Sequence, residues 1–241
     1  MRTTMYVGCW LALLLLAVPV EGQTKAASAE SYRQRGDEWQ AKGEWSRAID
    51  DYTLAIVFNP ACAEIYNNRG VARYASGAYA EAVADYTRAV ALNPRLASAF
   101  LNRGMARKAL GEVKEALADF DEAVRLAPEL VPAWNNRGTL RKAAGDLAGA
   151  RADFDRALAL NPRLAEGYNN RGNVLLAEQR FEEAIADYTR AIRLNPNYAI
   201  AYLNRGTARL SAGRVREARA DFEQCNRLAP GYGSIGEHGS R

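Results

Sequence analysis

Few side chains in this sequence have the types and spacing needed for catalysis or metal binding. The 241 residues include one histidine, His238, and three cysteines, with no C-x-x-C or H-x-x-x-H spacing among them. The ligand patterns typical of zinc sites are therefore missing. No G-x-S-x-G sequence, P-loop or Rossmann glycine pattern occurs either. We predict that the protein is not an enzyme and uses no cofactor and no metal.

Asparagine is the residue whose spacing best suits a binding function. Asn-Arg-Gly triplets recur every 34 residues and contain Asn68, Asn102, Asn136, Asn170 and Asn204. A carboxamide offers a donor and an acceptor together, which match the C=O and N–H groups of an extended peptide without reading its side chains. Two interpretations remain open, a row dedicated to binding peptide and an ordinary structural position of a repeat.

The 34-residue interval organises most of the chain. Proline keeps the same step at Pro60, Pro94, Pro128, Pro162, Pro196 and Pro230. Six units follow without insertion or deletion, at residues 29–62, 63–96, 97–130, 131–164, 165–198 and 199–232. A unit this short cannot bury its apolar face alone, so we expect the units to stack into a solenoid.

Each unit has the pattern of two helices joined by a turn. The apolar spacing is helical, and position 15 of the unit is glycine in five copies (Gly43, Gly77, Gly111, Gly145 and Gly213) and Gln179 in the fifth unit. Glycine there predicts a left-handed residue after a helix end. The second helix should stop before the proline, because proline disfavours α geometry in the residue preceding it.

Three further positions predict a tight contact between the two helices. Position 8 is glycine in all six units (Gly36, Gly70, Gly104, Gly138, Gly172 and Gly206), position 20 is alanine, and position 24 is aromatic. Glycine within a helix costs roughly 0.5–1 kcal/mol relative to alanine. We infer that the helices approach closely at this glycine and that the aromatic ring fills the space beside it.

These positions, with a further aromatic residue at position 4, resemble the tetratricopeptide repeat (TPR) family over residues 29–232. The resemblance implies an all-α, right-handed superhelical solenoid of six helix-turn-helix hairpins. It also implies that the first helices line a concave groove that holds extended peptide segments. Position 6 would face this groove, and its asparagines look like the ladder in the repeat domain of O-linked N-acetylglucosamine transferases.

Other candidate groove residues give the ladder a local character. Lys108 and Lys142 at position 12 would make the middle of the groove basic, and Tyr74 at the same position would add an aromatic wall. Acidic or carboxylate-bearing segments would then be favoured. The alternative is a solvated basic stripe with no dedicated ligand.

One departure from the commonest family pattern predicts internal ion pairs. Position 7 is arginine in every unit and position 23 is aspartate: Arg35, Arg69, Arg103, Arg137, Arg171 and Arg205 match Asp51, Asp85, Asp119, Asp153, Asp187 and Asp221. Opposite charges repeated in strict step indicate a ladder of partly buried pairs within or between units. The rival interpretation is a row of solvated charges that binds a partner.

The N-terminus has the pattern of an export signal. Residues 1–22 combine Arg2, an apolar run from Met5 to Val20 and a small residue at Gly22, so we predict a signal peptide, with a polar leader at 23–28. The alternative is an uncleaved membrane anchor. Cys62 and Cys225 lie at opposite ends of the array, so both are predicted to be free thiols. Residues 233–241 are predicted to form a flexible, glycine-rich tail.

These features together predict a non-catalytic, exported scaffold, periplasmic or secreted, that binds a protein or extended peptide in its concave groove. The net charge of +4 comes from 32 basic and 28 acidic residues, a balance that argues against a nucleic-acid partner. No membrane contact is expected after signal cleavage. The alternative function is a self-assembling homo-oligomer that docks through its last unit, because the glycine-rich tail supplies no capping helix.

Overall fold

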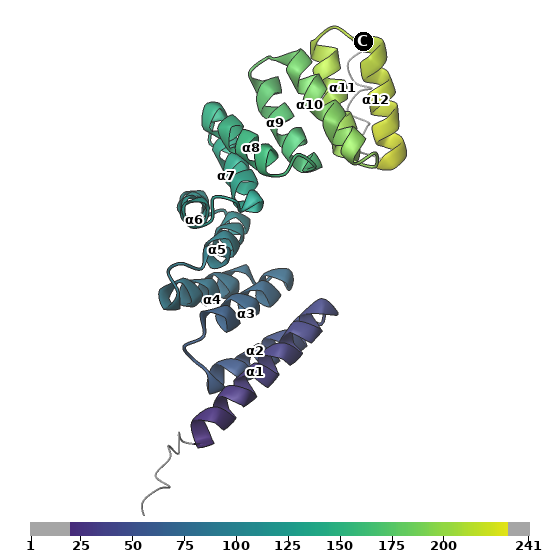
Figure 1. The fold of residues 1–241 in the computed structure, drawn as a ribbon. Helices are drawn as coiled ribbons and strands as arrows, with labels where there is room; N and C mark the ends of the chain where they lie inside the picture. The colour runs from purple at the N-terminus through teal and green to yellow at the C-terminus, as the bar shows by residue number, and fades with distance from the viewer. Residues whose placement is uncertain (1–19, 231–241) are drawn as a thin grey trace, which may run out of the picture.

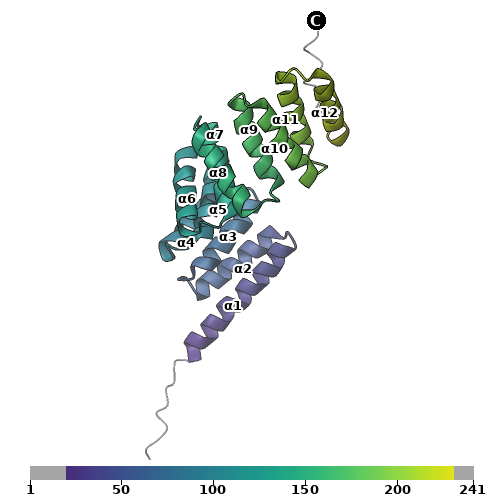
Figure 2. The same ribbon diagram turned by 45° about the horizontal axis from the view of Figure 1, so that its top comes forward.

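The computed structural model describes residues 20–230, and within this range the chain forms twelve α-helices and no strand. Most of the predicted signal peptide (residues 1–22) and all of the predicted tail (residues 233–241) lie outside the described residues. Figures 1 and 2 show hairpins that follow one another along a curved stack, with the first and last helices at opposite ends. The expected all-α solenoid is confirmed.

Each predicted unit supplies two consecutive helices. Their bounds are α1 (Val20–Ala41), α2 (Trp45–Phe58), α3 (Ala63–Ala75), α4 (Tyr79–Leu92), α5 (Ala97–Ala109), α6 (Val113–Leu126), α7 (Val131–Ala143), α8 (Leu147–Leu160), α9 (Ala165–Ala177), α10 (Phe181–Leu194), α11 (Ala199–Ser211) and α12 (Val215–Leu228). Helix α1 begins before the first unit and includes residues 23–28, the segment predicted as a polar leader.

The residue at position 15 of each unit forms the turn between the two helices of a hairpin. The five glycines there have φ between 74° and 85°, and Gln179 has φ of 59°. In the second unit the Gly77 amide donates to the Tyr74 carbonyl and the Ala78 amide donates to the Arg73 carbonyl, at 3.0 and 2.9 Å. These are the two bonds of a Schellman motif, which satisfy carbonyls at the end of the first helix.

The glycine at position 8 lets the two helices of a hairpin touch. A Cβ placed on Gly70 would lie 2.6 Å from Cε1 of Tyr86, and the same relation recurs in every unit. The rings of Tyr52, Tyr86, Phe120, Phe154 and Tyr188 are fully buried or nearly so. The predicted close contact is confirmed, and it explains why a residue unfavourable to helices recurs six times.

Neighbouring units complete one another's core. Phe120 and Val124 of α6 pack with Ala133 and Leu140 of α7, the next hairpin's first helix. Consecutive first helices also contact each other directly along the stack, from α1 and α3 through to α9 and α11. Because helices on the inside of a curved stack approach most closely, the first helices form its concave face.

The predicted arginine–aspartate ladder is present in all six units. Each position-7 arginine donates to the position-23 aspartate of its own unit; in the fourth unit, Arg137 Nη2 lies 2.6 Å from Asp153 Oδ1. The six aspartates are buried. Arginines also reach the preceding unit, since Arg69 donates to Thr53 and Arg137 to Asp121. The ladder therefore joins helices within a unit and units to each other.

No helix in the described part of the chain combines the length and hydrophobicity needed to cross a membrane.

Candidate functional site

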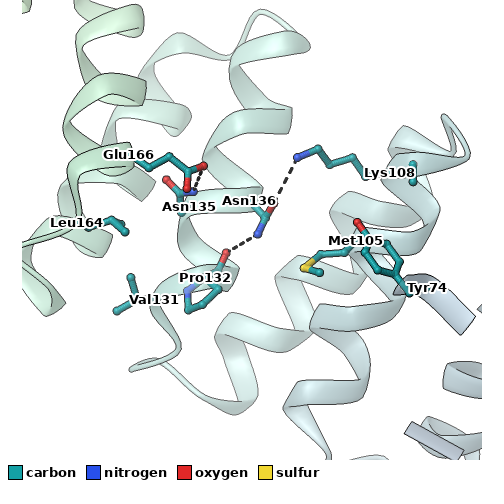
Figure 3. Close-up of a pocket in the computed structure, with 10 residues that line it drawn as sticks. Tyr74, Met105, Lys108, Val131, Pro132, Asn135, Asn136, Leu164 and Glu166 are labelled. Carbon is teal, nitrogen blue, oxygen red and sulfur yellow. Dashed lines mark hydrogen bonds between the residues drawn. The ribbon is translucent and has the colours of Figure 1, made fainter. Parts of the chain in front are cut away.

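A cavity of about 430 Å³ opens on the concave face at the middle of the stack. Four consecutive units contribute to it, through α3, α5, α7 and α9 and the residue that precedes α9. Figure 3 shows this arrangement. The lining residues are Tyr74, Met105, Lys108, Ala109, Val131, Pro132, Asn135, Asn136, Leu164 and Glu166.

The structure brings three of the predicted groove residues together in this cavity. Tyr74 comes from α3, Lys108 from α5 and Asn136 from α7. Lys108 Nζ donates to Asn136 Oδ1 at 3.3 Å, a contact between neighbouring units. Lys142 is half-buried on α7 and does not line the cavity, nor do Asn68, Asn102, Asn170 and Asn204.

Most position-6 asparagines also bridge units. Their Nδ2 groups donate to the asparagine at position 5 of the preceding unit: Asn102 to Asn67 at 3.0 Å, Asn170 to Asn135 at 3.2 Å, and Asn204 to Asn169 at 2.9 Å. Asn68 donates instead to Asp37 Oδ1 at 3.1 Å. The asparagine row therefore has a structural role, because it ties the first helices together along the groove.

This inter-unit row is interrupted at the cavity. The position-5 residue before Asn136 is Leu101, whose side chain has no acceptor. Asn136 Nδ2 turns back to its own helix and donates to the Pro132 carbonyl at 2.9 Å, which leaves Asn136 Oδ1 to accept from Lys108. One apolar substitution in the repeat pattern thus changes the local hydrogen bonding of the groove.

The cavity carries charges of both signs above an apolar floor. Glu166 Oε1 accepts a hydrogen bond from Asn135 Nδ2 at 3.1 Å, so Glu166 reaches α7 from the side opposite Lys108 (Figure 3). Met105, on the side of Lys108, and Val131 and Leu164, on the side of Glu166, supply apolar surface (Figure 3). The sequence predicted a basic centre for the groove, and the structure adds a carboxylate, Glu166, on the other side of Asn135 and Asn136 from the predicted Lys108 (Figure 3).

Sequence reasoning did not select Met105, Val131, Pro132, Leu164 or Glu166. These residues occupy four different positions of the repeat and meet only when successive units stack. The sequence offered one indication of this site at position 2 of the repeat. Glu166 occupies that position in the fifth unit, as a glutamate does in the second, whereas the fourth unit has Pro132 there.

The cavity lining combines several kinds of polar group with apolar surface. These groups are one phenol, one ammonium, one carboxylate and two carboxamides, and no nucleophile among them is held by a base. Among residues 20–230 no group of three His, Cys, Asp or Glu side chains is placed to hold a metal ion. Cys62 and Cys225 are free thiols, as predicted, and burial raises the pKa of both.

The fold and its groove define a helical-repeat solenoid, an architecture whose concave surface serves in contacts between proteins. The tetratricopeptide repeat family matches residues 63–96, 97–130, 131–164 and 199–232, and a further TPR repeat pattern matches residues 172–213. The chain belongs to the tetratricopeptide repeat family. Proteins of this family generally mediate protein–protein interaction and scaffolding.

Solved structures of other TPR proteins share the fold. The pilF protein of Pseudomonas aeruginosa is 21% identical, with a TM-score of 0.76 over 86% of this chain and 95% of its own. YrrB, described as a TPR protein with an unusual peptide-binding site, is 23% identical, with a TM-score of 0.63 over 75% of this chain and 93% of its own. The MamA protein is 23% identical, with a TM-score of 0.62 over 69% and 91%. No curated protein sequence matches the chain.

Proposed function

We propose that this protein is a non-catalytic scaffold that binds an extended segment of a partner protein in its concave groove. The observation that carries the proposal is the cavity of about 430 Å³ between the first helices of four consecutive units. Its volume falls within the range of about 300–1,000 Å³ that is typical of ligand sites. The peptide-binding site named for YrrB, a protein of similar fold, gives a precedent for this use of the architecture.

The proposed groove residues act in two ways. Asn68, Asn102, Asn136, Asn170 and Asn204 lie along the stack, where their carboxamides can pair with peptide backbone in addition to joining units. Lys108, Lys142 and Tyr74 add charge and aromatic surface near the centre. A guest that lies across several units also ties them together, so binding should stabilise the solenoid.

Selection from a library of random decapeptides with blocked termini tests the proposal. Binders are measured by fluorescence anisotropy against the wild type and against Met105→Glu, which places a carboxylate on the cavity floor. We expect at least tenfold weaker binding by this variant. The matched control is Ala91→Glu on α4, an exposed second-helix position, which should bind as the wild type does.

Two results would contradict the proposal: selection of no peptide, or equal binding by Met105→Glu and the wild type. The asparagines are tested separately by changing Asn102, Asn136 and Asn170 together to alanine. Because these side chains also join units, the melting temperature of this variant is measured alongside its affinity. Unchanged affinity would remove the asparagines from the binding surface.

We further propose that the protein acts after export, in the periplasm or outside the cell, with residues 1–22 removed. The support is the sequence pattern of this segment, with Arg2 before an apolar run. N-terminal sequencing of protein recovered from the cell envelope and the medium tests this. A first residue of Gln23 supports cleavage, whereas a retained N-terminus in the membrane fraction indicates an anchor.

Homotypic assembly through the last unit is the alternative function. Phe222 favours it, because this ring is only half-buried whereas the equivalent rings of the other units are buried. Arg219 opposes it, because its side chain is exposed and paired with Glu223 on the same helix. Light scattering over a dilution series distinguishes the two: a stable dimer broken by Leu228→Asp supports assembly, and a monomer at micromolar concentration excludes it.

A further inference from the structure

The central cavity presents two charged side chains of opposite sign that make no ion pair within residues 20–230. Lys108 and Glu166 are both exposed, and each is held against α7 by one asparagine, at 3.3 and 3.1 Å. Figure 3 shows Lys108 on one side of these asparagines and Glu166 on the other. Each charge is therefore positioned at the cavity and still available to a ligand.

Apolar side chains line the cavity beside the two charges and the asparagines that hold them (Figure 3). Met105 projects from α5, Val131 begins α7, and Leu164 precedes α9. Burying a large aliphatic side chain on such a floor is favourable in proportion to the apolar area removed from water. The cavity volume of about 430 Å³ accommodates a side chain of this size.

We propose that this cavity selects a peptide segment in which an apolar side chain lies between an acidic and a basic residue. The acidic group would contact Lys108, toward the N-terminal units, and the basic group would contact Glu166, toward the C-terminal units. The inference rests on the proposed function, because it specifies the ligand of the same groove.

The geometry of an extended chain sets the spacing of the acidic, apolar and basic residues in the peptide. In an extended chain alternate side chains point to the same face, so the two charged residues should stand two positions before and two positions after the apolar residue. A segment with like charges at both places would gain at one end of the cavity and lose at the other. Each exposed pair should change affinity by roughly two- to fivefold.

Blocked heptapeptides test this selectivity directly. Each peptide has a central leucine with serine on both sides, and the two flanking positions carry Glu and Lys, Glu and Glu, Lys and Lys, or Gln and Gln. Affinities are measured by anisotropy at low ionic strength. We expect the wild type to bind the Glu and Lys peptide at least fourfold more tightly than either like-charged peptide.

Charge reversal in the protein gives a sharper test. Lys108→Glu should shift the preference to the Lys and Lys peptide, and Glu166→Lys should shift it to the Glu and Glu peptide. The double variant should again prefer the Glu and Lys peptide, which would bind in the reverse direction. Glu129→Lys, an exposed residue outside the cavity, is the control for net charge and should keep the wild-type preference.

The outcomes separate this inference from the proposed function. Equal affinity of the wild type for all four peptides, with binding still lost in Met105→Glu, would overturn the charge selectivity and leave the groove proposal standing. Failure of all four heptapeptides to bind, while peptides selected from the random library do bind, would overturn the inference alone; failure of both sets would also contradict the proposed function. Unchanged preferences in the two single reversals would also overturn the inference, and thermal unfolding confirms that each variant is folded.

Discussion

Gly104 and Phe120 leave no room between them for a methyl group. A Cβ built on Gly104 would lie 2.7 Å from Cε1 of Phe120, closer than carbon atoms pack in proteins. Gly104 belongs to α5 and Phe120 to α6, so the contact fixes the distance between the two helices of one hairpin. The same contact recurs in every unit. It therefore sets the distance between the first helices, which line the groove, and the second helices behind them.

Replacing Gly104 with alanine should destabilise the fold by about 1–3 kcal/mol, the usual cost of overpacking a core. The sign is informative, because alanine would otherwise favour the helix by about 0.5–1 kcal/mol. Urea denaturation followed by circular dichroism measures the change. Combining Gly104→Ala with Phe120→Leu removes the ring edge that the new methyl group meets. The double variant should therefore lose less stability than the sum of the losses in the two single variants. A Gly104→Ala variant as stable as the wild type would refute the close contact.

Truncating Asp119 to alanine should destabilise the protein by about 3–5 kcal/mol. Its carboxylate accepts hydrogen bonds from both Arg103 and Arg107, and only 3% of its side chain is exposed, so removal leaves two poorly solvated arginines without their acceptor. Asp121→Ala is the control on the same helix. That side chain is 54% exposed, and its loss should cost about 1 kcal/mol or less. A loss below about 0.5 kcal/mol for Asp119→Ala would argue against a buried pair.

Changing Gln179 to glycine should stabilise the fold by about 1 kcal/mol. Gln179 has φ of 59°, a left-handed conformation that costs a residue with a Cβ roughly 1–2 kcal/mol. Glycine relieves that strain, although it loses more chain entropy on folding. The reciprocal change, Gly111→Gln at the equivalent turn, should destabilise by a similar amount. Equal urea midpoints for both variants and the wild type would show that the turn carries no strain.

Removing the Tyr86 hydroxyl should reduce the loss of stability in alkali. Burial, with a contribution from the charge of Asp85, raises the pKa of Tyr86 above its ordinary value of about 10. The protonated ring is then favoured in the folded state, so its contribution is complete below pH 10 and is lost as the pH rises above it. Tyr86→Phe should be tolerated, since Phe120 and Phe154 occupy the same position elsewhere. Denaturation midpoints between pH 9 and 11.5 should fall less steeply for the variant; identical slopes would contradict the assignment.

The repeat pattern predicted the features that every unit builds for itself. Arg137 and Asp153 are 16 residues apart in one hairpin, and the same spacing in all six copies indicated that they pair. Gly104 and Phe120 were predictable for the same reason, because their contact depends on one short turn. Such local relations are set by helix periodicity and by a turn of constant length.

The stacking of units decided the rest. Asn102 contacts Asn67 and Asn136 contacts Lys108 only because successive first helices lie side by side, and the difference between these partners arises from Leu101 in the neighbouring unit. The cavity combines Lys108 with Glu166, which belong to units two apart. A sequence gives the register of each helix face but not the rotation from one unit to the next, and that rotation determines which side chains share a site.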